Sequence, residues 1–540
     1  MTKKLLNAMG IRLVKRLQSN SKNTISDIDP IGKAGNDFPS FVLEKFSTLF
    51  IKALDDLREF ISIYFPLHVD MQFYSDLHDN QQKKTEIITR YHDKYFKIYI
   101  DKCPNNVKSL LEKLYLLDYY QINAIFFVIA SNNLFVLTVF KTTSLKTLTD
   151  KLTAQIMIYK YGNKSQQSKY LNHTFNFLFL VNETNFRSNE ILSTKTFIKS
   201  NANALTQSVV LKGEKTNVGI DCNNLVSNVL LIYVKDEDKT KTKSLKESLG
   251  FLIVDMNDTF INKIQKIKCY SLLTIDYYHL KFNSVSLESS YTLKLSKSGI
   301  DGFEIFCYQL YIKQVLFNTG MLSQAQQLIN FILQEANEKY TLLLSPPKAT
   351  KLIKADHFKS NLGKLFLELK QQISYNFSVC SDLNSFTNEN TVSNFAIAKL
   401  SVPQKCHQIF DWVFSVMESD VCMSTNSKFI QSKFLLQKYQ LEDKSGENLL
   451  YAIGKQKVTG FLRIKRGLNT FKLKNDQQEP EEDKENSIKL IATKDREEKM
   501  YNNSIKSAIS DILSSRGSLM SAENTNSYSA RPFSSGNNIN

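Results

Sequence analysis

A row of short, strand-like runs in the middle of the chain constrains the fold most. These runs are rich in β-branched and aromatic residues and are bounded by Asn, Gly, Lys and Asp: FNFLFLVNETNFRSN (175–189), SVVLKGEKTN (208–217), SNVLLIYVKD (227–236) and SLGFLIVDM (248–256). Such runs are typical of strands. The segments on both sides carry apolar residues at three- and four-residue spacing, which is typical of helices. The pattern predicts an α+β chain with a small β domain between two helical domains.

The N-terminal side of this region predicts buried helices. The run FVLEKFSTLFIKALDDLREFISIYF (41–65) predicts one amphipathic helix, and a second is expected over 107–120. The most apolar window, INAIFFVIASNNLFVLTVF (122–140), is interrupted by Ser131, Asn132 and Asn133. Because each remaining run is shorter than the ~20 apolar residues that cross a bilayer, we interpret the window as a buried helix and expect no membrane span.

The C-terminal side predicts long helices followed by a polar tail. Helical spacing covers residues 298–340 and 394–417, whereas NDQQEPEEDKENS (475–487) is acidic and residues 514–540 are mostly Ser and Asn. A tail with so little apolar surface is expected to be disordered. The predicted parts are an N-terminal helical domain (40–171), a middle β domain (172–290), a C-terminal helical bundle (298–455) and the tail (475–540).

Three motifs in and before the predicted β domain resemble the acyl-CoA dehydrogenase family. The block GNKSQQSKYL (162–171) is similar to the family's G-T-x-x-Q-K-x-x-Y-L. VNETNFRSN (181–189) resembles the flavin-contacting L-T-E-P-x-x-G-S-D and keeps Glu183 and Ser188. LKGEKTNVGID (211–221) resembles L-N-G-x-K-x-W-I-T-N-G and keeps Gly213 and Lys215. The resemblance implies an N-terminal helical domain, a middle β domain, a C-terminal bundle, FAD as cofactor and an acyl-CoA as substrate.

The resemblance also implies which residues would contact the flavin. The family places a Thr on the pyrimidine ring, a Trp beside the isoalloxazine and a Thr near N5, and these positions hold Asn182, Asn217 and Gly219 in this sequence. Asn182 keeps a hydrogen-bonding group, and Ser188 keeps one for a phosphate. Asn217 and Gly219 cannot reproduce the stacking ring and the hydroxyl. In the predicted bundle, Glu418 replaces a family glycine that lies near the flavin diphosphate, and a carboxylate repels a diphosphate.

The resemblance implies a catalytic glutamate after the bundle helices. In the family this Glu removes a proton from the acyl α-carbon while a hydride leaves the β-carbon for flavin N5. The counterpart is Glu442 in QLEDKSGENLL (440–450), which lacks the Gly and Thr that follow the family's base. A lone Glu in a charged loop is more often a solvated residue, so both interpretations of Glu442 stay open.

Charge and cysteine content restrict the location and the partners. Residues 1–26 lack acids and carry Leu5, Met9, Leu13 and Leu17 at four-residue spacing, which is typical of a mitochondrial transit peptide or of an ordinary basic surface helix. We expect the mitochondrial matrix. The net charge is +16, but no nucleic-acid-binding motif accompanies it, so no nucleic-acid partner is expected. The seven cysteines form no C-x-x-C pair, which predicts reduced thiols and no metal site.

Two functions from different classes remain. The first is a non-catalytic protein with a structural or assembly role in a mitochondrial complex. The second is an FAD-dependent dehydrogenase that performs α,β-dehydrogenation of an acyl-CoA in fatty-acid oxidation. Because several flavin-contacting positions have changed, the sequence favours the first. The expected partners are a second copy in a homodimer or the other subunits of a mitochondrial complex, with acyl-CoA as substrate if the chain is active.

Overall fold

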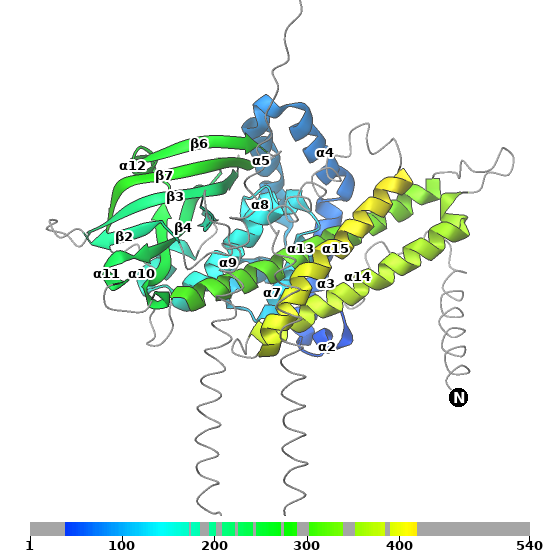
Figure 1. Ribbon diagram of the computed structural model, residues 1–540. Helices are drawn as coiled ribbons and strands as arrows, with labels where there is room; N and C mark the ends of the chain where they lie inside the picture. The colour runs from blue at the N-terminus through cyan, green and yellow to red at the C-terminus, as the bar shows by residue number, and fades with distance from the viewer. Residues whose placement is uncertain are drawn as a thin grey trace, which may run out of the picture.

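Figure 1 shows N-terminal helices, a β-sheet and long C-terminal helices in contact with one another. The computed structural model describes residues 38–171, 174–183, 194–200, 208–221, 225–240, 245–271, 275–288, 302–338, 351–383 and 389–417.

The N-terminal part is helical, and side-chain caps set several of its breaks. Its helices are α2 (Ser40–Leu43), α3 (Thr48–Tyr64), α4 (Leu67–Asp79), α5 (Lys84–Lys102), α6 (Asn105–Glu112), α7 (Tyr119–Ile129), α8 (Asn133–Phe140), α9 (Leu145–Tyr161) and α10 (Lys164–Tyr170). The prediction of a single helix over 41–65 is wrong, because the structure has two helices there, α2 and α3. Ser47 is the N-cap of α3, and its Oγ accepts a hydrogen bond from Phe50 N. The helix predicted over 107–120 also divides, because Asp118 caps α7 in a capping box with Gln121.

The apolar window at 122–140 forms two helices rather than one. Helices α7 and α8 meet at 118°. Asn132 caps α8 by accepting from Phe135 N at 2.9 Å, and the buried Asp70 accepts from Leu134 N at 2.8 Å. Nearly all side chains of both helices are buried. In the described part of the chain, no single helix has the length and apolar character to span a membrane.

The sheet has two layers with a core between them. Its strands are β1 (Phe175–Leu180), β2 (Phe197–Ser200), β3 (Ser208–Asp221), β4 (Ser227–Asp236), β5 (Leu249–Asp255), β6 (Ile264–Ser271) and β7 (Ile275–Glu288), with the short helices α11 (Glu237–Thr240) and α12 (Asp258–Ile261) between them. The strand order is β1-β4-β2-β3-β7-β6, and β5 pairs with β4. The β1–β4 and β2–β4 pairs are parallel. Side chains of β1, β4 and β5 alternate between the inter-layer core and the core shared with the helices.

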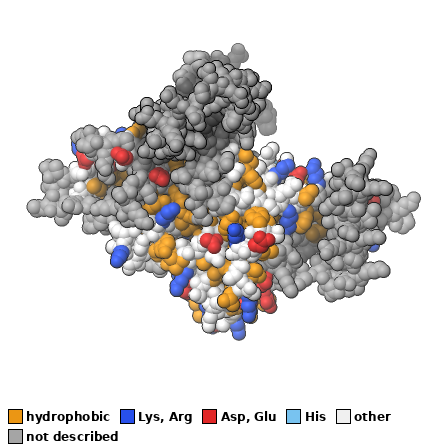
Figure 2. All heavy atoms as spheres, turned by 90° about the horizontal axis from the view of Figure 1, so that it is seen from below, with side chains coloured by type: hydrophobic (Ala, Val, Ile, Leu, Met, Phe, Trp, Pro, Cys, Tyr) orange, Lys and Arg blue, Asp and Glu red, His pale blue; other side chains and the backbone are white. Residues whose placement is uncertain are grey.

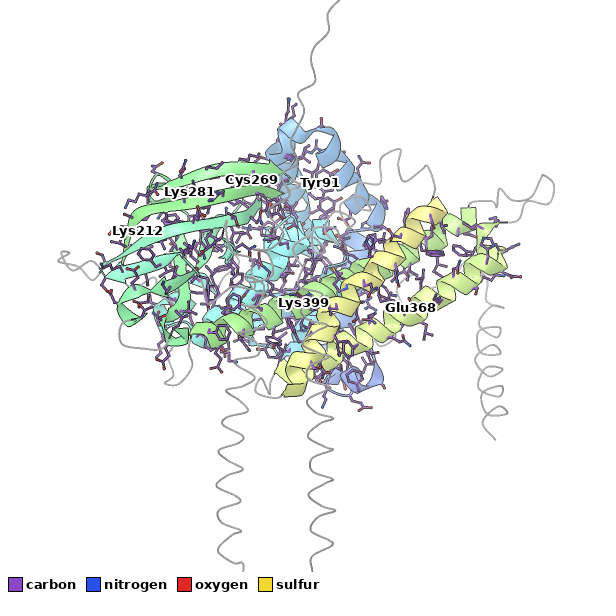
Figure 3. The ribbon with its side chains drawn as sticks, in the orientation of Figure 1. Tyr91, Lys212, Cys269, Lys281, Glu368 and Lys399 are labelled. Carbon is purple, nitrogen blue, oxygen red and sulfur yellow. The ribbon has the colours of Figure 1, made fainter. Side chains whose placement is uncertain are left out.

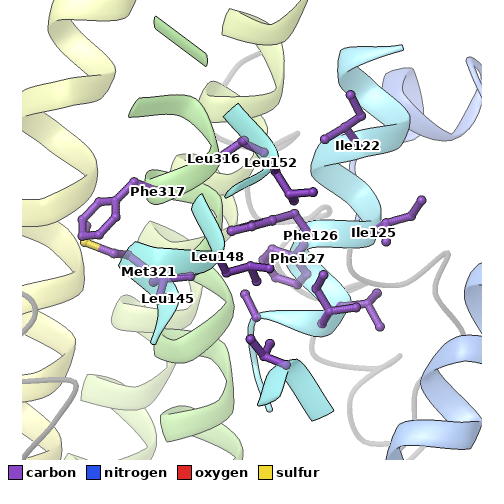
Figure 4. Close-up of a cluster of buried hydrophobic side chains, with 14 of the residues drawn as sticks. Ile122, Ile125, Phe126, Phe127, Leu145, Leu148, Leu152, Leu316, Phe317 and Met321 are labelled. Carbon is purple, nitrogen blue, oxygen red and sulfur yellow. The ribbon is translucent and has the colours of Figure 1, made fainter. Parts of the chain in front are cut away.

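The C-terminal part consists, within the described residues, of the long helices α13 (Gly302–Glu338), α14 (Asp356–Asp382) and α15 (Glu389–Met417). Helix α13 passes through the centre of the molecule (Figure 1). Its side chains Leu316, Phe317 and Met321 lie in one apolar cluster with residues of α7 and α9 (Figure 4). A Cβ added at Gly302 would lie 1.6 Å from Leu249 O, so the absence of a side chain lets α13 begin directly against β5.

Polar side chains connect the N-terminal and C-terminal helices inside this core. Asn376 Nδ2 donates to Thr319 Oγ1 at 2.8 Å, and Thr319 Oγ1 donates to Asn123 Oδ1 at 2.6 Å. All three residues are buried. Because a buried amide costs free energy unless its partners are in place, this network favours one arrangement of α7, α13 and α14.

Candidate functional site

The candidate site lies where β1 ends beside the middle of β3. Val181, Asn182 and Glu183 follow β1 directly, and Thr216 N donates to Asn182 O at 2.8 Å. This bond brings Asn182 next to the β3 segment that contains Asn217 and Gly219. The structure thus gathers three of the predicted cofactor-binding residues in one region.

A buried ion pair with several further hydrogen bonds lies in this region. Lys215 Nζ lies 2.7 Å from Glu183 Oε1, and their side chains are 0% and 3% exposed. Lys215 also donates to Val181 O at 3.2 Å. The other Glu183 contacts come from the segment before β2, where Lys195 N donates to Oε2 at 2.8 Å, Thr196 N donates to Oε1 at 3.1 Å, and the hydroxyls of Thr194 and Thr196 donate to Oε1.

These contacts decide the charge state of Glu183. Burial raises the pKa of its carboxyl, but the Lys215 ammonium and the hydrogen bonds outweigh burial and lower the pKa to about 2. For Lys215, burial is the larger effect and lowers its pKa to about 8, although Glu183 opposes the shift. Both groups are therefore charged at neutral pH. The pair holds the β1 end, the segment before β2 and β3 together.

Gly213 supports the same junction. Its φ is +129°, and an added Cβ would lie 2.6 Å from Thr196 Cα. Only glycine adopts that backbone conformation without strain and leaves room for Thr196. Gly213, Lys215 and Glu183, which all match family motifs, thus build the connection between strands.

Asn217 occupies an irregular point of β3. The pairing with β7 shifts register between Lys215 and Val218, which leaves Asn217 in a bulge. Its φ is +55°, and its side chain is exposed. Asn tolerates this left-handed conformation, whereas a bulky aromatic residue adopts it only with strain.

Gly219 lies against a tyrosine ring. Gly219 and Tyr277 are directly paired across β3 and β7, and Tyr277 is fully buried. A Cβ added at Gly219 would lie 2.9 Å from Tyr277 Cε1 and 3.0 Å from Ile275 Cγ2. The Tyr277 ring therefore takes the space that a side chain at position 219 would need.

The end of β3 anchors the site to the helices. Asp221 is buried and accepts from Thr143 N at 2.8 Å and from Thr143 Oγ1 at 2.5 Å. Thr143 lies in the connection between α8 and α9. The two contacts fix the position of the site relative to the helical core.

The structure describes only part of the predicted site. Asn182, Asn217 and Gly219 are placed as above, whereas Ser188 and Glu442 lie outside the described residues. No group of His, Cys, Asp and Glu among the described residues has a geometry that would hold a metal ion. Sequence reasoning missed the contacts of Thr194 and Thr196, because only the fold brings the segment before β2 beside Glu183. It missed Tyr277 because only the register of β3 and β7 places that ring against Gly219.

Comparison with solved structures shows what the arrangement resembles. A Mycobacterium abscessus protein described as an acyl-CoA dehydrogenase is 11% identical, with a TM-score of 0.61 over 77% of this chain and 99% of that chain. A glutaryl-CoA dehydrogenase from Mycobacterium smegmatis in complex with FADH2 is 12% identical, with a TM-score of 0.55 over 77% and 95%. Butyryl-CoA dehydrogenase from Megasphaera elsdenii is 12% identical, with a TM-score of 0.53 over 77% and 99%. No family model and no curated protein matches the sequence.

The chain has the acyl-CoA dehydrogenase fold. The α+β architecture expected from the sequence is therefore confirmed. Because one neighbour holds FADH2, a flavin is the group that the acyl-CoA dehydrogenase fold implies.

The described residues do not fit the flavin contacts that the resemblance implies. The left-handed backbone at Asn217 disfavours an aromatic ring at the stacking position. At Gly219, the Tyr277 ring leaves no room for the hydroxyl-bearing side chain. Of the described positions, Asn182 alone keeps a group that suits a flavin hydrogen bond.

Proposed function

We propose that this protein is a non-catalytic protein of the acyl-CoA dehydrogenase fold that serves a structural or assembly role in a mitochondrial complex. The observation that carries the proposal is the Tyr277 ring against Gly219, at the position that would approach flavin N5. Chemistry at that point requires a flavin held rigidly over the acyl chain. Because the Tyr277 side chain fills the space beside Gly219, this position favours packing within the sheet over contact with a cofactor.

The residues that still match the family support the same proposal. Glu183, Lys215 and Gly213 bond or pack within the sheet, and each has a structural reason to be present. The positions that would contact the flavin ring, Asn217 and Gly219, have changed. The residues that support the fold are therefore kept, whereas the residues that would contact the cofactor are changed, and this contrast favours a non-catalytic protein.

An activity measurement tests the proposal. The full-length protein, supplied with FAD, an electron acceptor and acyl-CoAs of short, medium and long chain, is expected to reduce no acceptor. Butyryl-CoA dehydrogenase assayed in parallel is the positive control. Reduction that depends on acyl-CoA and is abolished by Glu442→Gln would overturn the proposal and support the FAD-dependent dehydrogenase.

The mitochondrial part of the proposal has its own test. Residues 1–26 fused to a fluorescent reporter are expected to direct it to mitochondria, because they form a basic stretch without acids. A matched fusion carrying Arg12→Glu, Lys15→Glu and Arg16→Glu is expected to remain cytosolic. A cytosolic location of the unaltered fusion would remove the mitochondrial assignment and leave the enzymatic question unaffected.

A further inference from the structure

One side of the sheet carries a set of lysines that the candidate site does not use. Strands β2, β3 and β7 direct Ile198, Leu211 and Leu280 into the core between the layers. The alternate positions direct lysines outward. We call this set the lysine surface: Lys199, Lys212 and Lys281.

The position of the lysine surface is visible in the structure. Lys212 and Lys281 lie on the sheet, on the side of the molecule away from α14 and α15 (Figure 3). Lys281 lies between Glu214 of β3 and Gln265 of β6 in the cross-strand register. Lys199 and Lys212 are exposed, and Lys281 is half-buried.

The acid beside Lys281 on this face already has a partner. Glu214 Oε2 lies 3.2 Å from His279 Nε2. Lys199, Lys212 and Lys281 form no ion pair within the described part of the chain. By contrast, the underside of the molecule mixes both charge signs with hydrophobic side chains (Figure 2). The lysine surface is therefore a local excess of positive charge, which attracts a polyanion.

The chain itself contains a complementary segment. NDQQEPEEDKENS (475–487) has six acids and one lysine, whereas the whole chain has a net charge of +16. Roughly 60 residues separate it from the end of α15 at Met417, and a fully extended connection of that length spans at most on the order of 200 Å. The segment and the lysine surface belong to one chain, so their contact is intramolecular.

We propose that the acidic segment 475–487 binds the lysine surface of the same chain. The contact consists of carboxylates of the segment facing Lys199, Lys212 and Lys281 on the outer face of β2, β3 and β7. It goes beyond the proposed function, because it is independent of whether the chain binds a flavin. Since the contact is made by exposed charges, salt weakens it.

Carboxyl-to-amine cross-linking of the full-length protein tests this proposal. A carbodiimide joins a carboxylate directly to a lysine, and mass spectrometry identifies the joined peptides. We expect links from residues 475–487 to Lys199, Lys212 or Lys281 at low salt, and their loss at high salt. Lys212→Glu with Lys281→Glu is expected to lower the yield of these links about tenfold. Combining these with Glu481→Lys and Glu482→Lys is expected to restore linkage, because the charges are exchanged.

The controls separate this contact from other occupants. Lys52→Glu with Lys364→Glu removes two exposed lysines from α3 and α14 and is expected to leave the yield unchanged. Links that form equally to Lys52 and Lys364 would overturn the proposal. So would links that join isotopically labelled to unlabelled chains, which indicate a second copy. Nucleic acid that copurifies and is released by Lys212→Glu with Lys281→Glu would also overturn it.

Discussion

The pair of Glu183 and Lys215 shows how a residue that matches a cofactor motif can serve the sheet instead. Sequence comparison identified both residues, but a separation of 32 positions carries no signal that they touch. Their contact depends on the β1 end lying beside β3. The same limit applies to Tyr277, since the Gly219–Tyr277 pairing follows from strand register and not from either residue alone.

Breaking the ion pair is expected to be costly. Glu183→Gln leaves the Lys215 charge buried without its counter-charge, so the free energy of unfolding should fall by about 3–5 kcal/mol. Glu183→Gln combined with Lys215→Met should cost clearly less than the sum of the single variants. Lys359→Met is the matched control, because Lys359 and Asp356 form an exposed pair whose removal should cost under about 1 kcal/mol. Chemical unfolding of the full chain measures all four variants, and additive losses would contradict the coupling.

The lowered pKa of Glu183 predicts a loss of stability in acid. Its folded-state pKa of about 2 lies below the ordinary value of 4.5, so an unfolded chain takes up the proton first as the pH falls. The pair's contribution is present above about pH 4.5 and is lost as the pH approaches 2. Unfolding measured from pH 7 to pH 3 should show a steeper decline for the unaltered protein than for Glu183→Gln. Equal slopes would show that Glu183 is not charged in the folded state.

The Tyr277 ring predicts the effect of restoring a side chain at position 219. Gly219→Thr introduces a Cβ 2.9 Å from the ring, so stability should fall by about 1–3 kcal/mol. Adding Tyr277→Val should recover part of the loss by making room. Gly250→Thr is the control in β5, a strand elsewhere in the sheet, because nothing lies within 4 Å of its added Cβ. Thermal unfolding measures the stability of each variant. An unchanged stability of Gly219→Thr would show that the Tyr277 ring leaves room for a side chain at position 219.

Among the elements, hydrophobic periodicity predicted the long helix α13 and strands such as β4 well. The helix breaks were not predicted, because they depend on single caps: Ser47 before α3 and Asn132 before α8. Strand β6 falls inside the predicted β domain but was not singled out as a strand, since a lysine-rich edge strand lacks a clean alternation of apolar residues. The pairing of β1 with β4 joins strands about 50 residues apart, and no local pattern encodes it.

The start of α13 gives a prediction for the junction of sheet and bundle. Gly302→Ala places a Cβ 1.6 Å from Leu249 O, so α13 must shift away from β5. Because main-chain atoms cannot move aside easily, the thermal midpoint should fall by several degrees. Gly363→Ala in α14 meets nothing within 4 Å and should be neutral or stabilising. Equal behaviour of the two variants would contradict the close approach.

For the whole molecule, the fold was predicted from the sequence more completely than the cofactor site. Three motifs, GNKSQQSKYL among them, were enough to predict the acyl-CoA dehydrogenase fold, although the three solved structures compared above are only 11–12% identical to this chain. The candidate site was predicted in part: Asn182, Asn217 and Gly219 lie in one region, but the tyrosine that fills it was not foreseen. A residue pattern can thus specify the scaffold while the packing at single positions decides whether a cofactor fits.

The flavin content of the purified full-length protein tests the central claim most directly. We predict a colourless protein without a flavin absorbance band, and no band after incubation with excess FAD and removal of the free cofactor. The glutaryl-CoA dehydrogenase from Mycobacterium smegmatis, whose structure holds FADH2, should retain its flavin through the same steps and controls for loss during handling. A yellow protein whose absorbance bleaches on addition of an acyl-CoA would contradict the account, because it would show a flavin held in place for catalysis.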